Sequence, residues 1–560
     1  MLAIDKYKRG AGIFFSLSYI SFILELSVIY YLRSRQFSVD DSYITYRYAF
    51  HLKEGYGLVF NVGEAYYGTT AAGYAVFLAA ISLLATAVGN LFGAGASAWL
   101  DIPSLAVGVS TLALASVAGL LPVIARARED WRQWLICVIG AMLLFSDSSF
   151  NDDAGHETYA FLAVALLGTV CVGYFRKYVT GALLLAVAAS FRPDAVLMAG
   201  IVPCFDWMRS RLTIRDYLKD RRVIAFLTVY TVVFGSWLLY LSYHFGTPIP
   251  GTMTAKKAQA TLNYYEIYKP KALVKFVKNA LSGIGYYLML SGIFFAVASF
   301  VMTSLRGWKS RAIPQASQEK PGNFIAGVWL VFPLLTAEIY SSFHVSFWQW
   351  YGAPVLFSFL LVAFVGWTNL NNWMSVVSSR IGKNVFGAKF ALHALPVVML
   401  AVLVHGDLPR FSAWAQSDHP NPHIFAYSEI IDFIHKDSPD GAVIQMSEPG
   451  SFGYHLGPKY TIVDELGLIT PGAATALVKG DYAWTINKYH PKYLVCAWRG
   501  SYSACNHNFQ DNGYEFVGEF NKEFWVPRIE NGAKLYRLKK PADAQSEERS
   551  HQSGQVGVQQ

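Results

Sequence analysis

The sequence predicts an α-helical polytopic membrane protein with a small α/β soluble domain at its C-terminal end. Aliphatic and aromatic residues make up 54% of the 560 positions and charged residues only 15%, against about 25% charged residues in ordinary soluble proteins. Mean hydropathy is +0.30. Long apolar runs fill the chain up to about residue 405, and the remainder has the composition of a soluble domain.

Stretches of about 20 mostly apolar residues are long enough to cross a bilayer as helices. The apolar stretch from Val179 to Phe205 is interrupted by Arg192-Pro193-Asp194. Because proline disfavours helix before it, we expect two short helices to meet at this break. The other predicted spans are Ala11–Leu32, Ile102–Ala125, Trp134–Phe150, Thr158–Phe175, Val223–Tyr243, Ala280–Leu305, Asn323–Tyr340, Gly352–Leu370 and Phe390–His405.

Short clusters of lysine and arginine between the apolar runs predict the orientation, since cytoplasmic loops are enriched in these residues. All clusters face the cytoplasm if the 179–205 stretch crosses twice and the segment from Ala71 to Phe92 does not cross. We therefore expect that segment to lie in the membrane interface. This topology has about 11 transmembrane helices, with the N-terminus cytoplasmic and the C-terminal domain outside. The clustering also accounts for the net charge of +8 without nucleic-acid binding.

Three domains are expected. Residues 1–405 form the transmembrane domain, residues 406–540 an extracytoplasmic α/β domain, and residues 541–560 a polar, disordered tail. Within the second, patterning predicts one helix and three strands, at Tyr427–His435, Ala442–Met446, Tyr460–Val463 and Tyr493–Ala497. Cys496 and Cys505 can form a disulfide if this domain faces an oxidising compartment.

Two adjacent carboxylates, Asp40 and Asp41, follow the first span at the membrane surface. Such a pair can supply a general base, a metal ligand, or both. Alternatively, an aspartate here caps the helix expected from Tyr43 to Leu52.

The residues around this pair resemble the first outer loop of the GT-C glycosyltransferases, polytopic enzymes that take sugars from polyprenyl phosphates. The closest resemblance is to the bacterial branch that includes the mycobacterial terminal arabinofuranosyltransferase. The matching segments, in chain order, are Asp40 to Ala49, Gly55 to Asn61, Gly63-Glu64, Asp152 to Thr158, Arg192-Pro193-Asp194, Thr247 to Thr252 with Ala255-Lys256, Trp350 to Pro354, Glu448 to Tyr454, Val463-Asp464 and Gly467-Leu468. This chain departs from the pattern at Tyr67 to Thr70 and at Gly251, where the family usually has Asn.

The resemblance implies a role for each group of polar residues. Asp40 or Asp41 is the general base of an inverting transfer. Arg47, Arg192 and Lys256 bind the donor phosphate, since guanidinium and ammonium groups stabilise a leaving phosphate. The second acidic loop carries substrate-binding or metal-binding candidates, which are Asp152, Asp153, His156 and Glu157. Their oxygen and nitrogen atoms leave a divalent cation open as a cofactor.

Each of these residues also has a structural alternative. Arg47 can pair with a carboxylate in its own loop, and Arg192 can pair with Asp194 at the helix break. Lys256 can contact lipid head groups. Part of the second acidic loop can cap the helix that begins near Thr158.

We therefore expect a membrane glycosyltransferase of a bacterial inner membrane. It moves a sugar from a polyprenyl-phosphate donor to a cell-envelope glycan or lipid on the extracytoplasmic side. The alternative is a transporter or flippase of lipid-linked envelope precursors. That class of protein predicts paired ionisable residues near mid-membrane and pseudo-symmetric halves, whereas the ionisable residues here gather in the outer loops.

Overall fold

The chain folds into two units, each assembled from pieces far apart in the sequence. The first comprises Met1–Ser38, Ala85–Tyr243 and Glu266–Asp418, and the second comprises Val39–Leu84, His244–Tyr265 and His419–Gln560. The computed structural model describes residues 2–35, 39–91, 101–127, 130–146, 154–210, 212–262, 269–281, 283–309, 321–380, 394–406, 427–496, 513–520 and 533–539.

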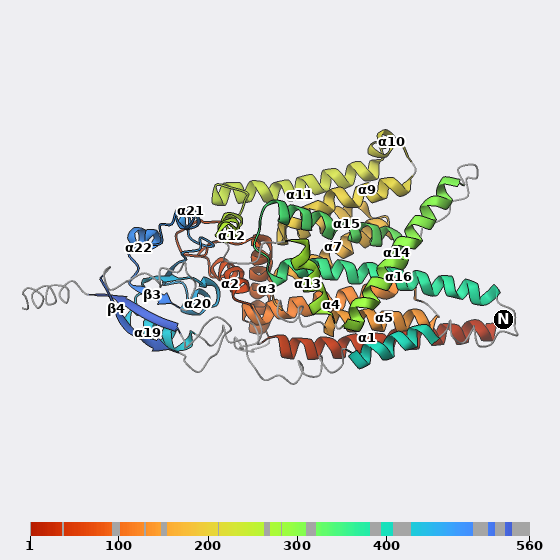
Figure 1. The fold of residues 1–560 in the computed structure, drawn as a ribbon, viewed down its shortest axis with the longest axis horizontal. Coiled ribbons are helices and arrows are strands. Elements are labelled where there is room, and N and C mark those ends of the chain that lie inside the picture. Colours follow the sequence, from red (N-terminus) through yellow and green to blue (C-terminus); the bar gives the residue numbers. More distant parts are fainter. Residues whose placement is uncertain are drawn as a thin grey trace, which may run out of the picture. The chain divides into compact units, whose positions relative to one another are not determined.

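The first unit is a bundle of apolar helices, in which α1, α4, α5 and α16 run alongside one another (Figure 1). Its long helices are α1 (Leu2–Ser34), α4 (Ile102–Ala125), α11 (Arg221–Phe245, ending in the second unit), α14 (Gly283–Lys309), α15 (Pro321–Ser342) and α16 (Gln349–Arg380). The shorter ones are α5 (Trp131–Ser146), α7 (Glu157–Gly173), α8 (Tyr178–Phe191), the 3-10 helix η2 (Pro193–Leu197), α9 (Met198–Ser210), α10 (Ile214–Leu218), α13 (Pro270–Ala280) and the helix Ala394–Gly406.

This arrangement confirms the predicted fold class. Seven described helices are long and apolar enough to cross a membrane, and four apolar helices are shorter. Helix α3 (Ala72–Leu91), which begins in the second unit, is among the seven. We predicted that α3 lies in the interface, and both that placement and the total of about 11 spans stay predictions.

Small residues bring the bundle helices into close contact. A Cβ atom added to Gly366 of α16 would lie 1.8 Å from the carbonyl oxygen of Gly292 in α14, and one on Gly292 would lie 2.6 Å from that of Ala363. Gly168 and Gly181 bring α7 and α8 together in the same way. Such contacts are typical of helices that pack in lipid, where backbone proximity replaces the hydrophobic drive of water.

The predicted break at Arg192-Pro193-Asp194 is confirmed. Helix α8 ends at Phe191, and Arg192 is extended with φ −143° and ψ 131°. Pro193 then opens η2, which leads into α9. A proline at this point lacks the amide hydrogen that would continue α8, while its fixed φ suits a new helical start.

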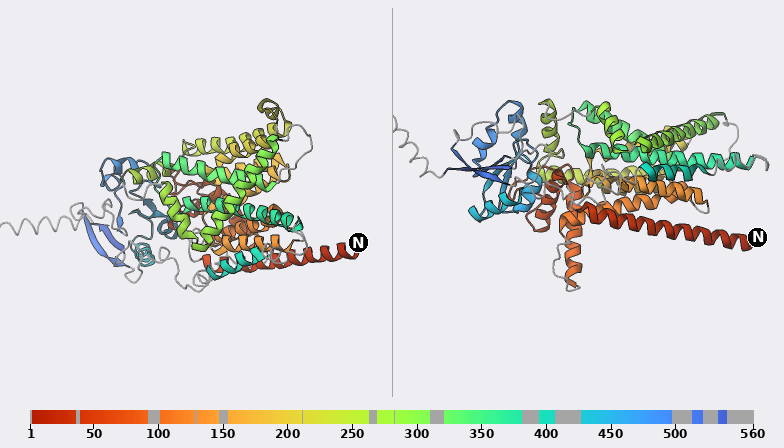
Figure 2. Two further views of the ribbon diagram at one scale, coloured as in Figure 1. Left: turned by 45° about the vertical axis from the view of Figure 1, so that its right-hand side comes forward. Right: turned by 60° about the horizontal axis from the view of Figure 1, so that its bottom comes forward.

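The second unit contains a five-stranded sheet in the order β2-β1-β3-β5-β4. β1 is parallel to both β2 and β3, and the pairs β3–β5 and β4–β5 are antiparallel. The further views in Figure 2 show this sheet with its short helices. The elements of the unit, besides α3, are α2 (Asp40–Lys53), α12 (Gly251–Thr261), α19 (Ser428–Asp437), β1 (Val443–Met446), α20 (Pro449–Leu456), β2 (Thr461–Val463), α21 (Ala473–Val478), α22 (Trp484–Tyr489), β3 (Tyr493–Cys496), β4 (Tyr514–Phe520) and β5 (Ala533–Leu538).

The predicted helix near Tyr427–His435 and the three predicted strands are confirmed within a few residues. The hairpin of β4 and β5 was not predicted from the sequence. The compact units also do not follow chain order, because the segments 39–84 and 244–265 belong with the C-terminal residues. The boundaries at residues 405 and 540 stay predictions.

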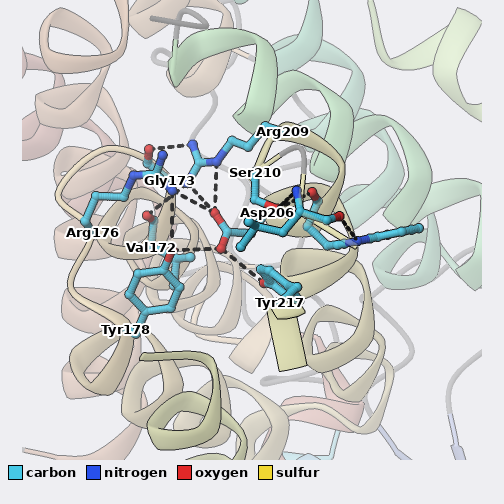
Figure 3. Close-up of polar contacts among 10 residues, drawn as sticks. Val172, Gly173, Arg176, Tyr178, Asp206, Arg209, Ser210 and Tyr217 are labelled. Carbon is cyan, nitrogen blue, oxygen red and sulfur yellow. Dashed lines mark hydrogen bonds and ion pairs between the residues drawn. The ribbon is translucent and has the colours of Figure 1, made fainter. Parts of the chain in front are cut away.

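The buried carboxylate of Asp206 in α9 connects this helix to α7, α8 and α10 (Figure 3). Asp206 Oδ1 accepts hydrogen bonds from Arg176 (2.9 Å) and Arg209 (2.6 Å), while Oδ2 accepts from Tyr178 (2.7 Å) and Tyr217 (3.1 Å). Arg209 also donates to two carbonyl oxygens at the end of α7, those of Val172 and Gly173. The carboxylate is therefore compensated by two cations and two phenols.

Replacing this carboxylate should destabilise the protein. Asp206→Asn leaves Arg209 buried without a counter-charge, and breaking such a buried pair typically costs about 3–5 kcal/mol of folding free energy. We expect a loss near the lower limit, because the side chain of the other partner, Arg176, is half exposed. We expect a lower unfolding temperature in detergent. The exposed Asp216, whose side chain accepts a hydrogen bond from Thr213, provides the control Asp216→Asn. Equal unfolding temperatures for the two variants would contradict the assigned role.

Candidate active site

An ion pair joins the first outer loop to α12 within the second unit. Asp41 lies in the first turn of α2, and its Oδ2 is 3.3 Å from Nζ of Lys256. The Lys256 side chain is 8% exposed, whereas that of Asp41 is 26% exposed. A carboxylate held next to one cation and still open to solvent can accept a proton from an incoming hydroxyl group.

The neighbouring carboxylate has a different environment. Asp40 Oδ1 accepts a hydrogen bond from the amide of Ser451 (2.7 Å), and Oδ2 accepts one from the amide of Gly450 (3.1 Å). Both amides belong to the first turn of α20, where backbone N–H groups have no partner within the helix. Asp40 thus acts as a capping group, although for α20 and not for its own helix, whose N-cap is Val39.

Arg47 is buried, and each of the three nitrogens of its guanidinium donates a hydrogen bond to the backbone. It donates to the carbonyl oxygens of Phe60 (2.8 Å), Gly453 and Tyr460 (2.8 Å). The phenyl ring of Phe60 also faces the guanidinium, with its centroid 4.8 Å away. Burial lowers the pKa of Arg47 to about 9. These contacts favour a structural role over binding of a donor phosphate.

Two further contacts link the first loop to β2, through Asn61, and to the loop after β2, through Gly68. Asn61 pairs with the backbone of Ile462, accepting from its amide (3.0 Å) and donating to its carbonyl (2.8 Å). Buried Asp464 accepts from the amides of Leu468 (2.7 Å) and Ile469 (2.9 Å), which shapes this loop. Burial raises the pKa of Asp464 to about 6. A Cβ atom on Gly68 would lie 2.9 Å from the Leu468 carbonyl, so this contact requires glycine.

The two departures from the family pattern contact each other. Gly251 donates its amide hydrogen to the carbonyl of Tyr67 at 2.8 Å. A Cβ atom on Gly251 would lie 2.0 Å from Oη of Tyr66. The phenol therefore occupies the space that a side chain at position 251 would need, next to the helix that carries Lys256.

The remaining described candidates gather in the first unit. Arg192 contacts Asp194 (3.1 Å), Glu157 (3.3 Å) and Thr158 (3.2 Å), and Nδ1 of His156 lies 3.0 Å from Glu157. The expected pairing of Arg192 with Asp194 is present. His156 occupies the N-cap position of α7 without a side-chain capping hydrogen bond, and both it and Glu157 are buried. Capping by the rest of this loop stays a prediction, because its other two carboxylates lie outside the described residues.

Aromatic side chains surround this charged group. The indole rings of Trp348 and Trp350 are stacked with centroids 5.0 Å apart, and the Trp350 ring lies 5.9 Å from that of His156. The centroid of Tyr351 is 5.8 Å from the Arg192 guanidinium. Flat rings next to a cation can hold a sugar face or an isoprenoid chain.

Two sequence candidates, Asp152 and Asp153, lie outside the described residues, as does Cys505. Cys496 is disulfide-bonded. Among the described residues, His, Cys, Asp and Glu side chains form no group of three or more that could hold a metal ion. The divalent cation stays a hypothesis.

No family model and no curated protein matches the sequence. ArnT from Cupriavidus metallidurans in the apo state matches with a TM-score of 0.54 and 12% identity, over 93% of this chain and 98% of ArnT. The same protein bound to undecaprenyl phosphate matches with a TM-score of 0.52 and 13% identity, over 93% of this chain and 97% of ArnT.

This chain has the ArnT fold. A weaker likeness, with a TM-score of 0.49 and 11% identity, is to the archaeal oligosaccharyltransferase AglB from Archaeoglobus fulgidus in complex with an inhibitory peptide and a dolichol-phosphate, over 85% of this chain and 69% of AglB. ArnT is a GT-C protein, so the expected GT-C-like architecture is present. The narrower resemblance to the arabinofuranosyltransferase branch stays a prediction.

Sequence reasoning assigned no role in the site to Tyr66, nor to Gly450 and Ser451, which lie in the matching segment Glu448 to Tyr454. Tyr66 directly precedes the segment Tyr67–Thr70, where this chain departs from the family pattern. That departure was the feature of the sequence that could have indicated a role for Tyr66. The other two act through backbone amides, which any residue except proline supplies, so no side-chain pattern marks them.

Acid should lower the folding stability of the second unit, because His51 of α2 is buried in its neutral form. Burial, reinforced by the charge of Arg47, lowers the pKa of His51 to about 4, and Nδ1 pairs with the carbonyl of Val59 at 3.0 Å. Since unfolded histidine titrates near pH ~6.5, the unfolded chain binds a proton that the native state does not. Stability should therefore fall as the pH drops from about 6.5 to about 4.

His51→Asn keeps a donor near the Nδ1 position and removes the titration. Unfolding temperatures measured between pH 7.5 and 4.5 should consequently depend less on pH in this variant than in the natural protein. Parallel curves for the two proteins would show that other groups cause the acid sensitivity.

Proposed function

We propose that the protein is a membrane glycosyltransferase that moves a sugar from a polyprenyl-phosphate donor to a cell-envelope glycan or lipid. The observation that carries this proposal is the Asp41–Lys256 pair, which combines a partly exposed carboxylate with a buried cation at 3.3 Å. Such a pair supplies the two groups that the transfer requires, a proton acceptor and a phosphate counter-charge.

Asp41 is the proposed general base. It takes the proton of the acceptor hydroxyl while that oxygen attacks the anomeric carbon. The bond from this carbon to the phosphate oxygen breaks, the configuration inverts, and polyprenyl phosphate leaves with the bonding electron pair. Asp40 is a poorer candidate, because both of its oxygens already accept hydrogen bonds from backbone amides.

Lys256 is the proposed partner of the donor phosphate. Its side chain is 8% exposed, and this enclosure by protein argues against the alternative of a contact with lipid head groups. Arg192 is engaged by Asp194 and Glu157, and we assign it to holding the helix break. Arg47 is assigned to the packing of the first loop. The stacked Trp348 and Trp350 are candidates for binding a sugar or an isoprenoid.

The comparison with ArnT supports a lipid-phosphate donor, because that protein was solved with undecaprenyl phosphate and shares the fold. The disulfide at Cys496 supports an oxidising, extracytoplasmic location for the C-terminal domain, since disulfides are rare in the cytosol. We therefore propose a bacterial inner membrane with the N-terminus in the cytoplasm. A transporter or flippase is the alternative, and the Asp41–Lys256 pair favours the enzyme.

Replacement of the base should abolish turnover. Asp41→Asn keeps the size of the side chain and removes the proton acceptor, so we expect the rate to fall by about 100-fold to 10,000-fold. The assay measures release of polyprenyl phosphate from a panel of polyprenyl-phosphate sugars by the protein in detergent. Asp432→Asn, on the exposed face of α19, is the matched control. Full activity of Asp41→Asn would rule out this base.

A further inference from the structure

The N-terminus of α20 is an anion-binding position filled by a residue of this chain. This helix follows β1, and its first amides point at the carboxylate of Asp40 at 2.7 and 3.1 Å. A helix N-terminus favours negative charge because its amides are unpaired and the helix dipole is positive there. Asp40 comes from a segment 410 positions earlier than Gly450.

The two backbones meet so closely that only glycine fits. A Cβ atom on Gly450 would lie 2.0 Å from the carbonyl oxygen of Asp40 and 2.8 Å from its Oδ2. An alanine at position 450 must therefore push the start of α2 away from α20. In an isolated helix the same change would be favourable, since alanine has the higher helix propensity.

One face of α2 rests on α20 along two turns. Asp40 binds the first amides, the ring of Tyr43 lies 5.5 Å from that of Tyr454, and Arg47 donates to the carbonyl of Gly453. Positions 40, 43 and 47 share one side of a helix. Asp41 is one residue further on, turned by about 100°, and pairs with Lys256 of α12.

We propose that Asp40 is a positioning residue, through which the C-terminal domain fixes Asp41 for the reaction. This inference rests on the proposed function, because it takes Asp41 as the base. The contact of Asp40 with Gly450 and Ser451 sets the rotation and height of the first turn of α2. With that turn held, the Asp41 carboxylate stays at Lys256. Without it, the first turn frays and the base is misplaced.

Gly450→Ala tests the proposal without changing the amino-acid sequence of the first loop. A shift of about 1 Å in a reacting group can cost roughly 100-fold in rate, so we expect kcat to fall by about 10-fold to 100-fold with a smaller change in KM. Gly518→Ala in β4, whose added Cβ would make only ordinary contacts at 3.5 Å, should keep the natural rate. Asp40→Asn, which loses the charge and one acceptor, should also lower kcat.

Hydrogen exchange gives a readout that does not depend on turnover. Amides in residues 40–47 and 450–451 should exchange faster in Gly450→Ala and Asp40→Asn, and at the natural rate in Asp41→Asn and Gly518→Ala. If Gly450→Ala does not yield folded protein, Asp40→Asn carries the same comparison.

The outcomes separate the two proposals. Unchanged exchange in both Asp40→Asn and Gly450→Ala would show that the contact does not hold α2, and faster exchange with an unchanged kcat would show that it does not position the base. Either result overturns the inference and leaves the proposed function intact. Full activity of Asp41→Asn would instead overturn the base assignment, and with it the inference.

Discussion

The packing of the second unit depends on a buried arginine, whose guanidinium donates hydrogen bonds to backbone carbonyl oxygens. Arg47 joins its own loop, through Phe60, to α20 and to the start of β2, through Gly453 and Tyr460. A guanidinium can do this because its donors form a planar fork and it keeps its charge when buried. Removing it would leave three carbonyl groups without their partner, and each unsatisfied group costs about 1–3 kcal/mol.

Buried charged groups in the first unit are likewise paired with opposite charges and hydrogen-bonded. Asp206 has two arginines and two tyrosines, and Arg192 has two carboxylates. In each case a helix terminus or break supplies the location, so the charged groups also hold the apolar helices in register. An isolated charge in such surroundings would be far less stable than one that is paired and hydrogen-bonded.

Structural features could be predicted from the sequence where a single physical constraint acts on many residues at once. Bilayer thickness and hydropathy predicted most of the bundle helices, and Pro193 predicted the break after Phe191. Lys256 and Asp41 were both candidates, but their pairing was not predictable, since their positions differ by 215. The separate roles of Asp40 and Asp41 also could not be predicted. Two adjacent carboxylates look alike in sequence, whereas in the structure Asp40 accepts from the amides of Gly450 and Ser451 and Asp41 pairs with Lys256.

The contact between Arg47 and Gly453 has a consequence for biosynthesis. The two residues are 406 positions apart, and translation proceeds at about 5–20 residues per second, so the arginine emerges roughly 20–80 s before its partner. During that interval the bundle helices can insert and pack, while the first loop has none of its C-terminal contacts. The second unit can therefore complete its contacts only after Gly453 has left the ribosome, when the bundle helices up to that point have already been made.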